Sequence, residues 1–433
     1  MESKQIAEVV KDSEEGGITE KKKTLFSDLH SDQKEQRIDS ASALQRYLDH
    51  IPISSIPGIK NSLVLELKTG DSVKDAIRTL YENNIFCAPI ADVLDPNGTS
   101  TRFSNRCIGI IGFASMVLWC LEEYENIRKN SNDSDQLQAM ENNGLFSILD
   151  QIPQIGQTKV GELAKSFLWE SFFPVRLEDT LFHALLLLSK HQLQVLPVIE
   201  QSNSQLIGFA TQSAVVQLLL QSSGLAWFDS IADKALSDFR FENQQHPITV
   251  FGDQIVADAL HLLWKSRIGA VAIVDRETTK LIGTVRNSDV YQLVKKDDLL
   301  RSIRSLTVVE FILMETDKVD SDPTIERDLD LAAIAAGSLQ LRNSLVPRMD
   351  SPVTNKKTET LKQVMKHMAQ KNTSFSFLIN DSSQVTSVIT ITDLILQFAP
   401  PCVNSSIKGG GFFELALEQS GCHVTDGMII CNH

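Results

Sequence analysis

The chain contains one pattern of apolar and polar residues four times, and this internal repeat restricts its possible folds more than any other feature. Each copy begins with an apolar stretch, continues with an acidic or amide residue that opens an apolar-faced helix, and then forms a short apolar strand. The four copies start at Val64, Phe173, Ile248 and Val353. A chain that repeats one supersecondary unit forms its core by packing the copies against one another.

Counting residues tests the alignment of the four copies. The helix-opening column consists of Asp71, Asp179, Gln254 and Glu359. Five positions later the residues are Ala76, Ala184, Ala259 and Val364. Eighteen positions later they are Pro89, Pro197, Ala272 and Phe377, each followed by apolar residues. Because both columns agree without gaps, we interpret the copies as equivalent structural units.

The second half of each copy predicts a further strand, a turn and a second helix. These stretches begin at Cys107, Leu206, Leu281 and Val385. The strands are rich in β-branched residues, and the helices have apolar residues at i, i+3, i+4 and i+7. The sequence therefore predicts an α/β (α+β) fold of four β-α-β-β-α units.

The repeats define the expected domain boundaries. We expect repeats over residues 46–125, 159–225, 226–298 and 346–400. The remaining segments are predicted as a disordered tail (1–43), a flexible insertion (126–158), a helical connector (299–345) and a weakly patterned C-terminal tail (401–433).

Charge and composition exclude several classes of function. The net charge is −14, from 41 Lys+Arg and 55 Asp+Glu, which argues against binding to nucleic acid or acidic membranes. The apolar uncharged stretch Cys107–Leu121 has 15 residues and is shorter than the ~18 that span a bilayer. Six cysteines are few for this length and favour a reducing compartment. We expect no nucleic-acid partner, no membrane span and a cytoplasmic location, with the nucleus as an alternative.

The four units resemble the cystathionine-beta-synthase (CBS) domain repeat, paired as two Bateman modules. The resemblance rests on the β-α-β-β-α order and on the stretches LPVIE (196–200) and LIGFAT (206–211). Within that superfamily the chain is similar to the gamma regulatory subunits of the AMP-activated kinase family, in the plant sucrose-nonfermenting-related branch. The stretches that carry this match are LQRYLDHIPISSIPG (44–58), TQSAVVQLLLQSSGLAWFDS (211–230) and WKSRIGAVAIVDRETTKLIGTVRNSDV (264–290).

This resemblance implies a pseudo-symmetric disc of four CBS units and a non-catalytic role. It further implies that the chain holds a kinase catalytic alpha subunit and a beta (or beta-gamma) subunit together in energy sensing and carbohydrate metabolism. Some family members bind AMP, ADP or ATP in their clefts, and no cofactor is required. The alternative is a free-standing CBS protein that senses an adenosine derivative and regulates another enzyme.

The turn before the second helix supplies the candidate nucleotide contacts. In this repeat the turn usually has the pattern Gly-x-x-Ser/Thr-x-x-Asp. The Asp suits the vicinal hydroxyls of a ribose, and the hydroxyl and helix amides suit phosphate or base. The candidates are Arg286 and Asp289 in the third copy, Thr390 and Asp393 in the fourth, and Thr211 in the second. Such residues are also ordinary helix caps, worth about 1 kcal/mol, so capping is an alternative interpretation.

A nucleotide site in this chain would need a cationic side chain to neutralise the phosphate. Nucleotide-sensing family members carry His or Arg two to three residues before the proline column. Here those positions hold Phe86, Cys87, Gln194, Val195, Gly269, Ala270, Ser374 and Phe375. A buried phosphate without a cation costs several kcal/mol. Unless Arg267, Arg286, His367 or Lys371 substitutes, we expect nucleotide binding to be weak or lost.

Other chemistry has less support in the sequence. No Ser-His-Asp, paired-carboxylate or kinase signature occurs in context, so we expect no enzyme activity. In the C-terminal tail, Cys422, His423, Cys431 and His433 match no usual zinc spacing, so we expect no metal site.

Overall fold

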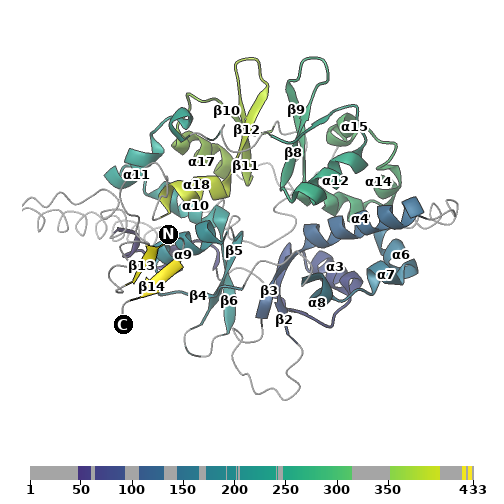
Figure 1. The fold of residues 1–433 in the computed structure, drawn as a ribbon, viewed down its shortest axis with the longest axis horizontal. Coiled ribbons are helices and arrows are strands. Elements are labelled where there is room, and N and C mark those ends of the chain that lie inside the picture. The colour runs from purple at the N-terminus through teal and green to yellow at the C-terminus, as the bar shows by residue number, and fades with distance from the viewer. Residues whose placement is uncertain are drawn as a thin grey trace, which may run out of the picture. The chain divides into compact units, whose positions relative to one another are not determined.

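Four three-stranded sheets of the same topology form the frame of the protein in the computed structural model (Figure 1). In each sheet the second strand lies in the middle, parallel to the first strand and antiparallel to the third. The strands of the first two copies are β1 (Leu67–Lys68), β2 (Cys87–Ala91), β3 (Cys107–Gly112), β4 (Val175–Arg176), β5 (Val195–Ile199) and β6 (Leu206–Thr211). Those of the last two are β7 (Thr249–Phe251), β8 (Ala270–Val274), β9 (Leu281–Arg286), β10 (Thr354–Asn355), β11 (Phe375–Ile379) and β12 (Val385–Thr390).

The structure describes residues 47–59, 64–92, 107–130, 144–164, 172–191, 193–200, 202, 205–239, 241, 247–314, 352–399, 422–425 and 428–431. All of them belong to one compact unit, Leu44–His433. The predicted disordered tail over residues 1–43 lies outside the described residues.

Two helices accompany each sheet, which confirms the predicted β-α-β-β-α order. The helices between the first and second strands are α3 (Val73–Glu82), α9 (Leu181–Lys190), α12 (Val256–Ser266) and α17 (Leu361–Gln370). The helices after the third strands are α4 (Phe113–Asn130), α10 (Gln212–Gln221), α13 (Val290–Lys295) and α18 (Ile391–Phe398). A 3₁₀ turn, η8 (Asn287–Asp289), precedes α13.

The four residues of the helix-opening column have the same role in all copies. A side-chain oxygen of each accepts the backbone N–H three positions earlier, at 2.7–2.8 Å. These bonds close the turn after the first strand. The helix N-cap is therefore the following residue, namely Ser72, Thr180, Ile255 and Thr360.

The proline column is equally regular. Pro89, Pro197, Ala272 and Phe377 are each the third residue of the central strand. Each pairs with the third strand, opposite Ile110, Phe209, Thr284 and Val388. The predicted alignment of the four copies is therefore confirmed.

The segment that leads into each copy packs on the neighbouring copy. Four isolated backbone bridges show this exchange: Pro52 with Thr180, Lys159 with Ser72, Ala235 with Thr360 and Thr307 with Ile255. Copies one and two thus exchange lead-in segments, and so do copies three and four. The lead-in elements are η2 (Ile53–Ser55), α8 (Val160–Leu163), η6 (Leu236–Phe239) and α15 (Val308–Leu313). The exchange confirms that the repeats are paired as two modules.

In three of the four sheets, one position on the third strand lies close to a lead-in segment that crosses the sheet. A Cβ atom on Gly208 would lie 1.8 Å from the Ile59 carbonyl oxygen, and one on Gly283 would lie 2.4 Å from Ile312 Cδ1. At the corresponding place in the fourth copy, the buried Ser387 hydroxyl donates a hydrogen bond of 2.9 Å to the Phe241 carbonyl. The glycines are therefore explained by close approach of another chain segment.

The two modules pack through their helices. One apolar cluster joins copies one and three, where α4 contacts α12 (Figure 1). A second cluster joins copies two and four, where α18 contacts α9 and α10. Each cluster therefore joins one copy of the first module to one copy of the second, although the two copies are not adjacent in the sequence.

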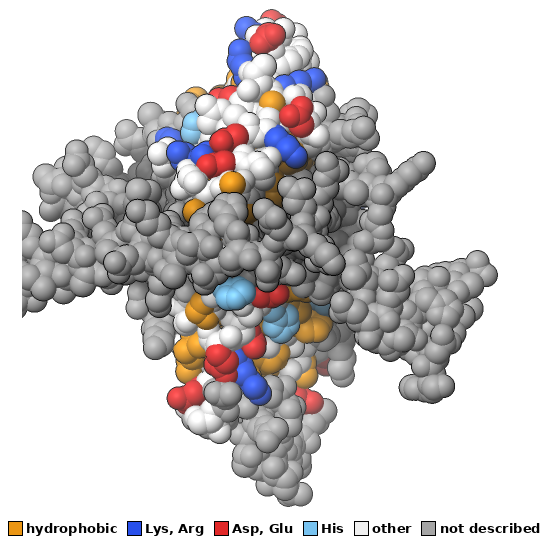
Figure 2. Space-filling view, turned by 90° about the vertical axis from the view of Figure 1, so that its left-hand side faces the viewer, with side chains coloured by type: hydrophobic (Ala, Val, Ile, Leu, Met, Phe, Trp, Pro, Cys, Tyr) orange, Lys and Arg blue, Asp and Glu red, His pale blue; other side chains and the backbone are white. Residues whose placement is uncertain are grey.

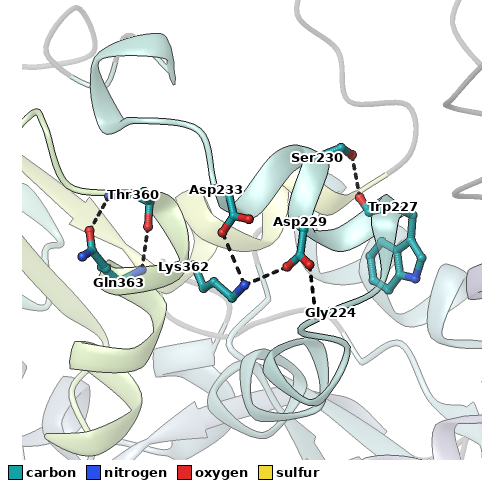
Figure 3. Close-up of polar contacts among 8 residues, drawn as sticks. All are labelled: Gly224, Trp227, Asp229, Ser230, Asp233, Thr360, Lys362 and Gln363. Carbon is teal, nitrogen blue, oxygen red and sulfur yellow. Dashed lines mark hydrogen bonds and ion pairs between the residues drawn. The ribbon is translucent and has the colours of Figure 1, made fainter.

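Ion pairs from Lys362 connect the lead-in segment of copy three to copy four (Figure 3). Lys362 on α17 donates to Asp229 on α11 (Ala226–Ala232) at 2.7 Å and to Asp233, the C-cap of α11, at 3.3 Å. These carboxylates raise the pKa of Lys362, with Asp229 contributing most. The Lys362 Nζ atom also lies 5.8 Å from the centre of the Phe228 ring.

Two predicted loop segments form regular structure instead. The predicted flexible insertion contains the end of α4 as well as α6 (Gly144–Gln151) and α7 (Pro153–Gly156). These helices form because Leu145, Ile148 and Leu149 are buried in the core of the first copy. The C-terminal tail contains an antiparallel hairpin of β13 (Cys422–Thr425) and β14 (Met428–Cys431).

The predicted helical connector is helical where it is described. It contains α14 (Asp297–Ser302) and α15. Residues 315–345 of the predicted connector lie outside the described residues.

Candidate functional site

Thr390 and Asp393 form a capping box at the start of α18. The Thr390 hydroxyl and backbone N–H donate to Asp393 Oδ2 at 2.7 and 2.8 Å. The Asp393 backbone N–H donates in return to Thr390 Oγ1 at 3.3 Å. The structure therefore gives both candidate nucleotide contacts a capping role.

Arg286 and Asp289 form the equivalent arrangement at η8. The Arg286 backbone N–H donates to Asp289 Oδ2 at 2.9 Å, and its guanidinium donates to Oδ1 at 3.4 Å. Asp289 is 3% exposed, and Arg286 donates a hydrogen bond to each of its carboxylate oxygens. A ribose would have to displace these bonds to reach the carboxylate.

Thr211 is the N-cap of α10. Its side-chain oxygen accepts the Ala214 backbone N–H at 3.1 Å, and the residue is 6% exposed. All five candidates thus cap a helix or turn. Their contact with a nucleotide stays a prediction.

The packing of the copies brings three of the five candidates to one interface. Gln212, next to Thr211, donates to the Thr392 hydroxyl at 3.0 Å and to the Leu193 carbonyl at 2.8 Å. Thr392 lies between Thr390 and Asp393, so the starts of α10 and α18 meet. Arg286, at the end of β9, and Asp289, on the turn η8, lie elsewhere; η8 contacts α4 of the first copy.

Apolar contacts between paired sheets occupy several of the positions where a nucleotide site was expected to carry a cation. Cys87 and Val195 lie in one buried cluster with side chains from β3 and β6. Ala270 and Phe375 lie in another, where the Phe375 and Phe377 rings are 5.5 Å apart at 65°. The two sheets of each module therefore meet through apolar side chains at these positions.

All four possible substitute cations already interact with other groups of the chain. The Arg286 guanidinium contacts Asp289, as described above. The His367 Nδ1 atom lies 3.0 Å from the Asn355 amide nitrogen. Arg267 ends α12 in the left-handed conformation, with φ 53° and an exposed side chain.

A buried polar network in the fourth copy was missed by the sequence analysis. Asn355, 2% exposed, donates to Glu359 Oε2 at 2.7 Å and accepts from the Ser376 hydroxyl at 2.6 Å. The repeat alignment contains the signal, since the column of Asn355 is otherwise apolar. In the other copies it holds Leu67, Val175 and Val250.

A pocket of about 280 Å³ lies between α4 and α12. Two polar side-chain pairs line it: a hydrogen bond between His261 Nδ1 and Glu122 Oε2 at 2.8 Å, and an ion pair in which Arg304 Nε donates to Glu125 Oε1 at 2.7 Å. None of the five candidate residues lines this pocket. It belongs to the packing of copy one on copy three.

The described residues contain neither a metal-binding cluster nor a membrane-spanning helix. No group of three or more His, Cys, Asp and Glu in the described ranges is arranged to hold a metal ion. Every helix described is too short or too polar to cross a bilayer. Among the described side chains visible in Figure 2, acidic and basic groups are interspersed.

Comparisons with known proteins agree with this architecture. The CBS domain family model matches residues 161–221 and 239–296, which fall in the second and third copies. The crystal structure of protein MJ1225 from Methanocaldococcus jannaschii, proposed as an archaeal homologue of gamma-AMPK, superposes with a TM-score of 0.50 at 14% identity. It covers 81% of this chain and 100% of that one. This likeness concerns the fold.

Two plant relatives extend the similarity along the sequence. "SNF1-related protein kinase regulatory subunit gamma-1" of Arabidopsis thaliana is 25% identical over 86% of both chains. The gamma-1-like subunit of the same plant is 23% identical over 83% of this chain and 89% of its own. The second and third copies thus match the CBS domain model, and over most of its length the chain is similar to the regulatory gamma subunits of plant SNF1-related kinases.

Proposed function

We propose that this protein is a non-catalytic gamma-type regulatory subunit of a heterotrimeric energy-sensing Ser/Thr protein kinase. In this role it scaffolds a catalytic alpha subunit and a beta (or beta-gamma) subunit. It works in the cytoplasm, with the nucleus as a second location. Adenine nucleotides bind weakly or not at all.

One observation carries the proposal: sequence similarity to two plant gamma subunits extends over more than four fifths of the chain. Four copies, two modules and the helical contacts between modules account for most of the described residues. The part of the chain that is described has no separate domain left for catalysis. A role in assembly fits this arrangement better than an enzymatic one.

The side chains at the expected cation positions favour weak or absent nucleotide binding. A phosphate in a partly buried cleft needs a cation to offset its desolvation. Cys87, Val195, Ala270 and Phe375 instead pack in apolar clusters at the expected cation positions. Asp289, a candidate ribose ligand, is buried against Arg286.

Co-purification tests the proposed role in assembly. The full chain is co-expressed untagged with a tagged beta subunit and the catalytic subunit of a plant SNF1-related kinase. Arabidopsis gamma-1 serves as the positive control. We expect the chain to elute with both partners in a stable complex. Elution as a lone monomer, under conditions in which gamma-1 assembles, would contradict the proposal.

A free-standing sensor of an adenosine derivative is the alternative function. It is favoured by the meeting of Thr211, Thr390 and Asp393 at one interface, where helix N-termini and hydroxyls can bind an anion. Titration with S-adenosylmethionine and the adenine nucleotides separates the two functions. A sensor would bind one of them without kinase subunits, and Asp393→Ala would abolish that binding.

A further inference from the structure

The C-terminal hairpin places two cysteines opposite each other. Its four paired positions are Cys422 with Cys431, His423 with Ile430, Val424 with Ile429 and Thr425 with Met428. Two residues, Asp426 and Gly427, separate the strands in the sequence. Asp-Gly is among the most favoured pairs for a two-residue hairpin connection.

The register determines which kind of pair the cysteines form. A two-residue connection closes on a hydrogen-bonded pair, here Thr425 with Met428, because these are the first and last residues of the turn. Hydrogen-bonded and non-hydrogen-bonded pairs then alternate along an antiparallel ladder. Cys422 and Cys431 lie three pairs further along, so they form a non-hydrogen-bonded pair.

Non-hydrogen-bonded pairs suit a disulfide. Their α-carbons lie about 4.5 Å apart, within the range of about 4.4–6.8 Å that disulfides usually span. Directly opposite residues also project to the same face of a hairpin. The backbone pairing of residues 422 and 431 is therefore compatible with a disulfide.

We propose that Cys422 and Cys431 are a redox-modification site, which forms a reversible disulfide across the C-terminal hairpin. A peroxide is the oxidant: a thiolate attacks it, one water leaves, and the resulting sulfenic acid condenses with the second thiol and releases a second water. Two thiols thus lose two electrons and two protons, and one peroxide becomes two waters. A dithiol reductant reverses the reaction by thiol–disulfide exchange.

The cysteines in the repeats provide an internal comparison. Cys87 and Cys120 are 4% and 1% exposed in the core of the first copy. Burial raises the pKa of the Cys120 thiol strongly, and the nearby Glu123 raises it further, so the reactive thiolate is disfavoured. We expect these thiols to stay reduced while the hairpin oxidises. The proposal does not depend on a role in a kinase complex.

Peptide mapping tests the proposal on the full chain. The folded protein is treated with hydrogen peroxide, alkylated and digested with trypsin. Cys422 and Cys431 fall in one tryptic peptide, residues 409–433, whereas Cys402 falls in the preceding one. We expect this peptide to lose two hydrogens and to carry no alkyl group. Treatment with dithiothreitol should restore two alkylation sites.

A shifted cysteine gives a matched control. Cys431→Ser combined with Ile430→Cys keeps the number of thiols but moves one of them to the opposite face of the hairpin. At a fixed glutathione redox ratio, we expect at least roughly tenfold less intrapeptide disulfide in this variant. Equal disulfide in both proteins, full alkylation of Cys422 and Cys431 after peroxide, or cross-linking of either to Cys402 would overturn the proposal.

Discussion

Replacement of Gly208 by alanine tests the exchange of lead-in segments. Gly208 lies on β6 of the second copy, and the lead-in segment of the first copy crosses it at Ile59. A Cβ atom at this position would lie 1.8 Å from the Ile59 carbonyl oxygen. This oxygen belongs to the backbone, so no side-chain rotation relieves the collision.

The size of the effect follows from this distance. Nonbonded heavy atoms prefer a separation of about 3.5 Å, so the strand or the lead-in segment must move by roughly 1.7 Å. Overpacking of this kind usually costs about 1–3 kcal/mol. For a module of this size we expect the melting temperature to fall by about 2–4 °C for each kcal/mol lost.

Urea denaturation followed by circular dichroism measures the cost. Gly269→Ala is the matched control, because no atom lies within 4 Å of the Cβ position there and its backbone is not left-handed. We expect the control to unfold like the wild type. If Gly208→Ala also matched the wild type, the first lead-in segment would not lie on β6, and the exchange within the module would be refuted.

Three further predictions concern single contacts. Lys362→Met removes the ion pairs between α17 and α11 and should cost at most about 1 kcal/mol in urea denaturation. Because the pKa of Lys362 is raised, the ion pairs stabilise the fold at neutral pH, and this stabilisation is lost as the pH rises through the pKa of Lys362 in the folded state. A destabilisation by Lys362→Met that occurs only in acid would contradict this. Hydrogen bonds from Thr307 lower the pKa of Glu310, so its cap stabilises the fold above about pH 4.5. The difference in urea midpoint between wild type and Glu310→Gln should therefore shrink in acid, and a constant difference would refute this. Thr390→Ala should cost about 1 kcal/mol by removing the cap of α18, whereas an unchanged urea midpoint would argue against that role.

The alignment of the repeats was predictable because it depends on local patterns. Each residue of the helix-opening column accepts a hydrogen bond from the backbone N–H three positions earlier. The proline column lies on a central strand, among apolar residues. These features are set by residues close together in the sequence. The exchange of lead-in segments was not predictable, because Pro52 and Thr180 are far apart and the sequence around Pro52 does not specify which copy it joins.

The two missed elements have different causes. In the predicted insertion, a stretch rich in Asn, Ser and Gln precedes α6 and suggested a loop, although the apolar residues that follow it pack in the core. In the tail, Asp426-Gly427 between two apolar stretches is a hairpin signal that the sequence analysis overlooked.

The candidate site was partly predictable. Capping by Thr390, Asp393 and Asp289 follows from their place at a helix start, and the structure shows it. The meeting of α10 with α18 depends on packing between modules, which no single repeat encodes.

Isothermal titration calorimetry of the full chain with AMP, ADP and ATP tests the central claim most directly. The account predicts no saturable heat up to about 1 mM nucleotide, because apolar side chains in buried clusters occupy the expected cation positions. Saturable binding tighter than this would contradict it, particularly if Asp393→Ala abolished the heat. Such a ligand, at a hundred times its Kd, would also add about 2.7 kcal/mol to the free energy of unfolding.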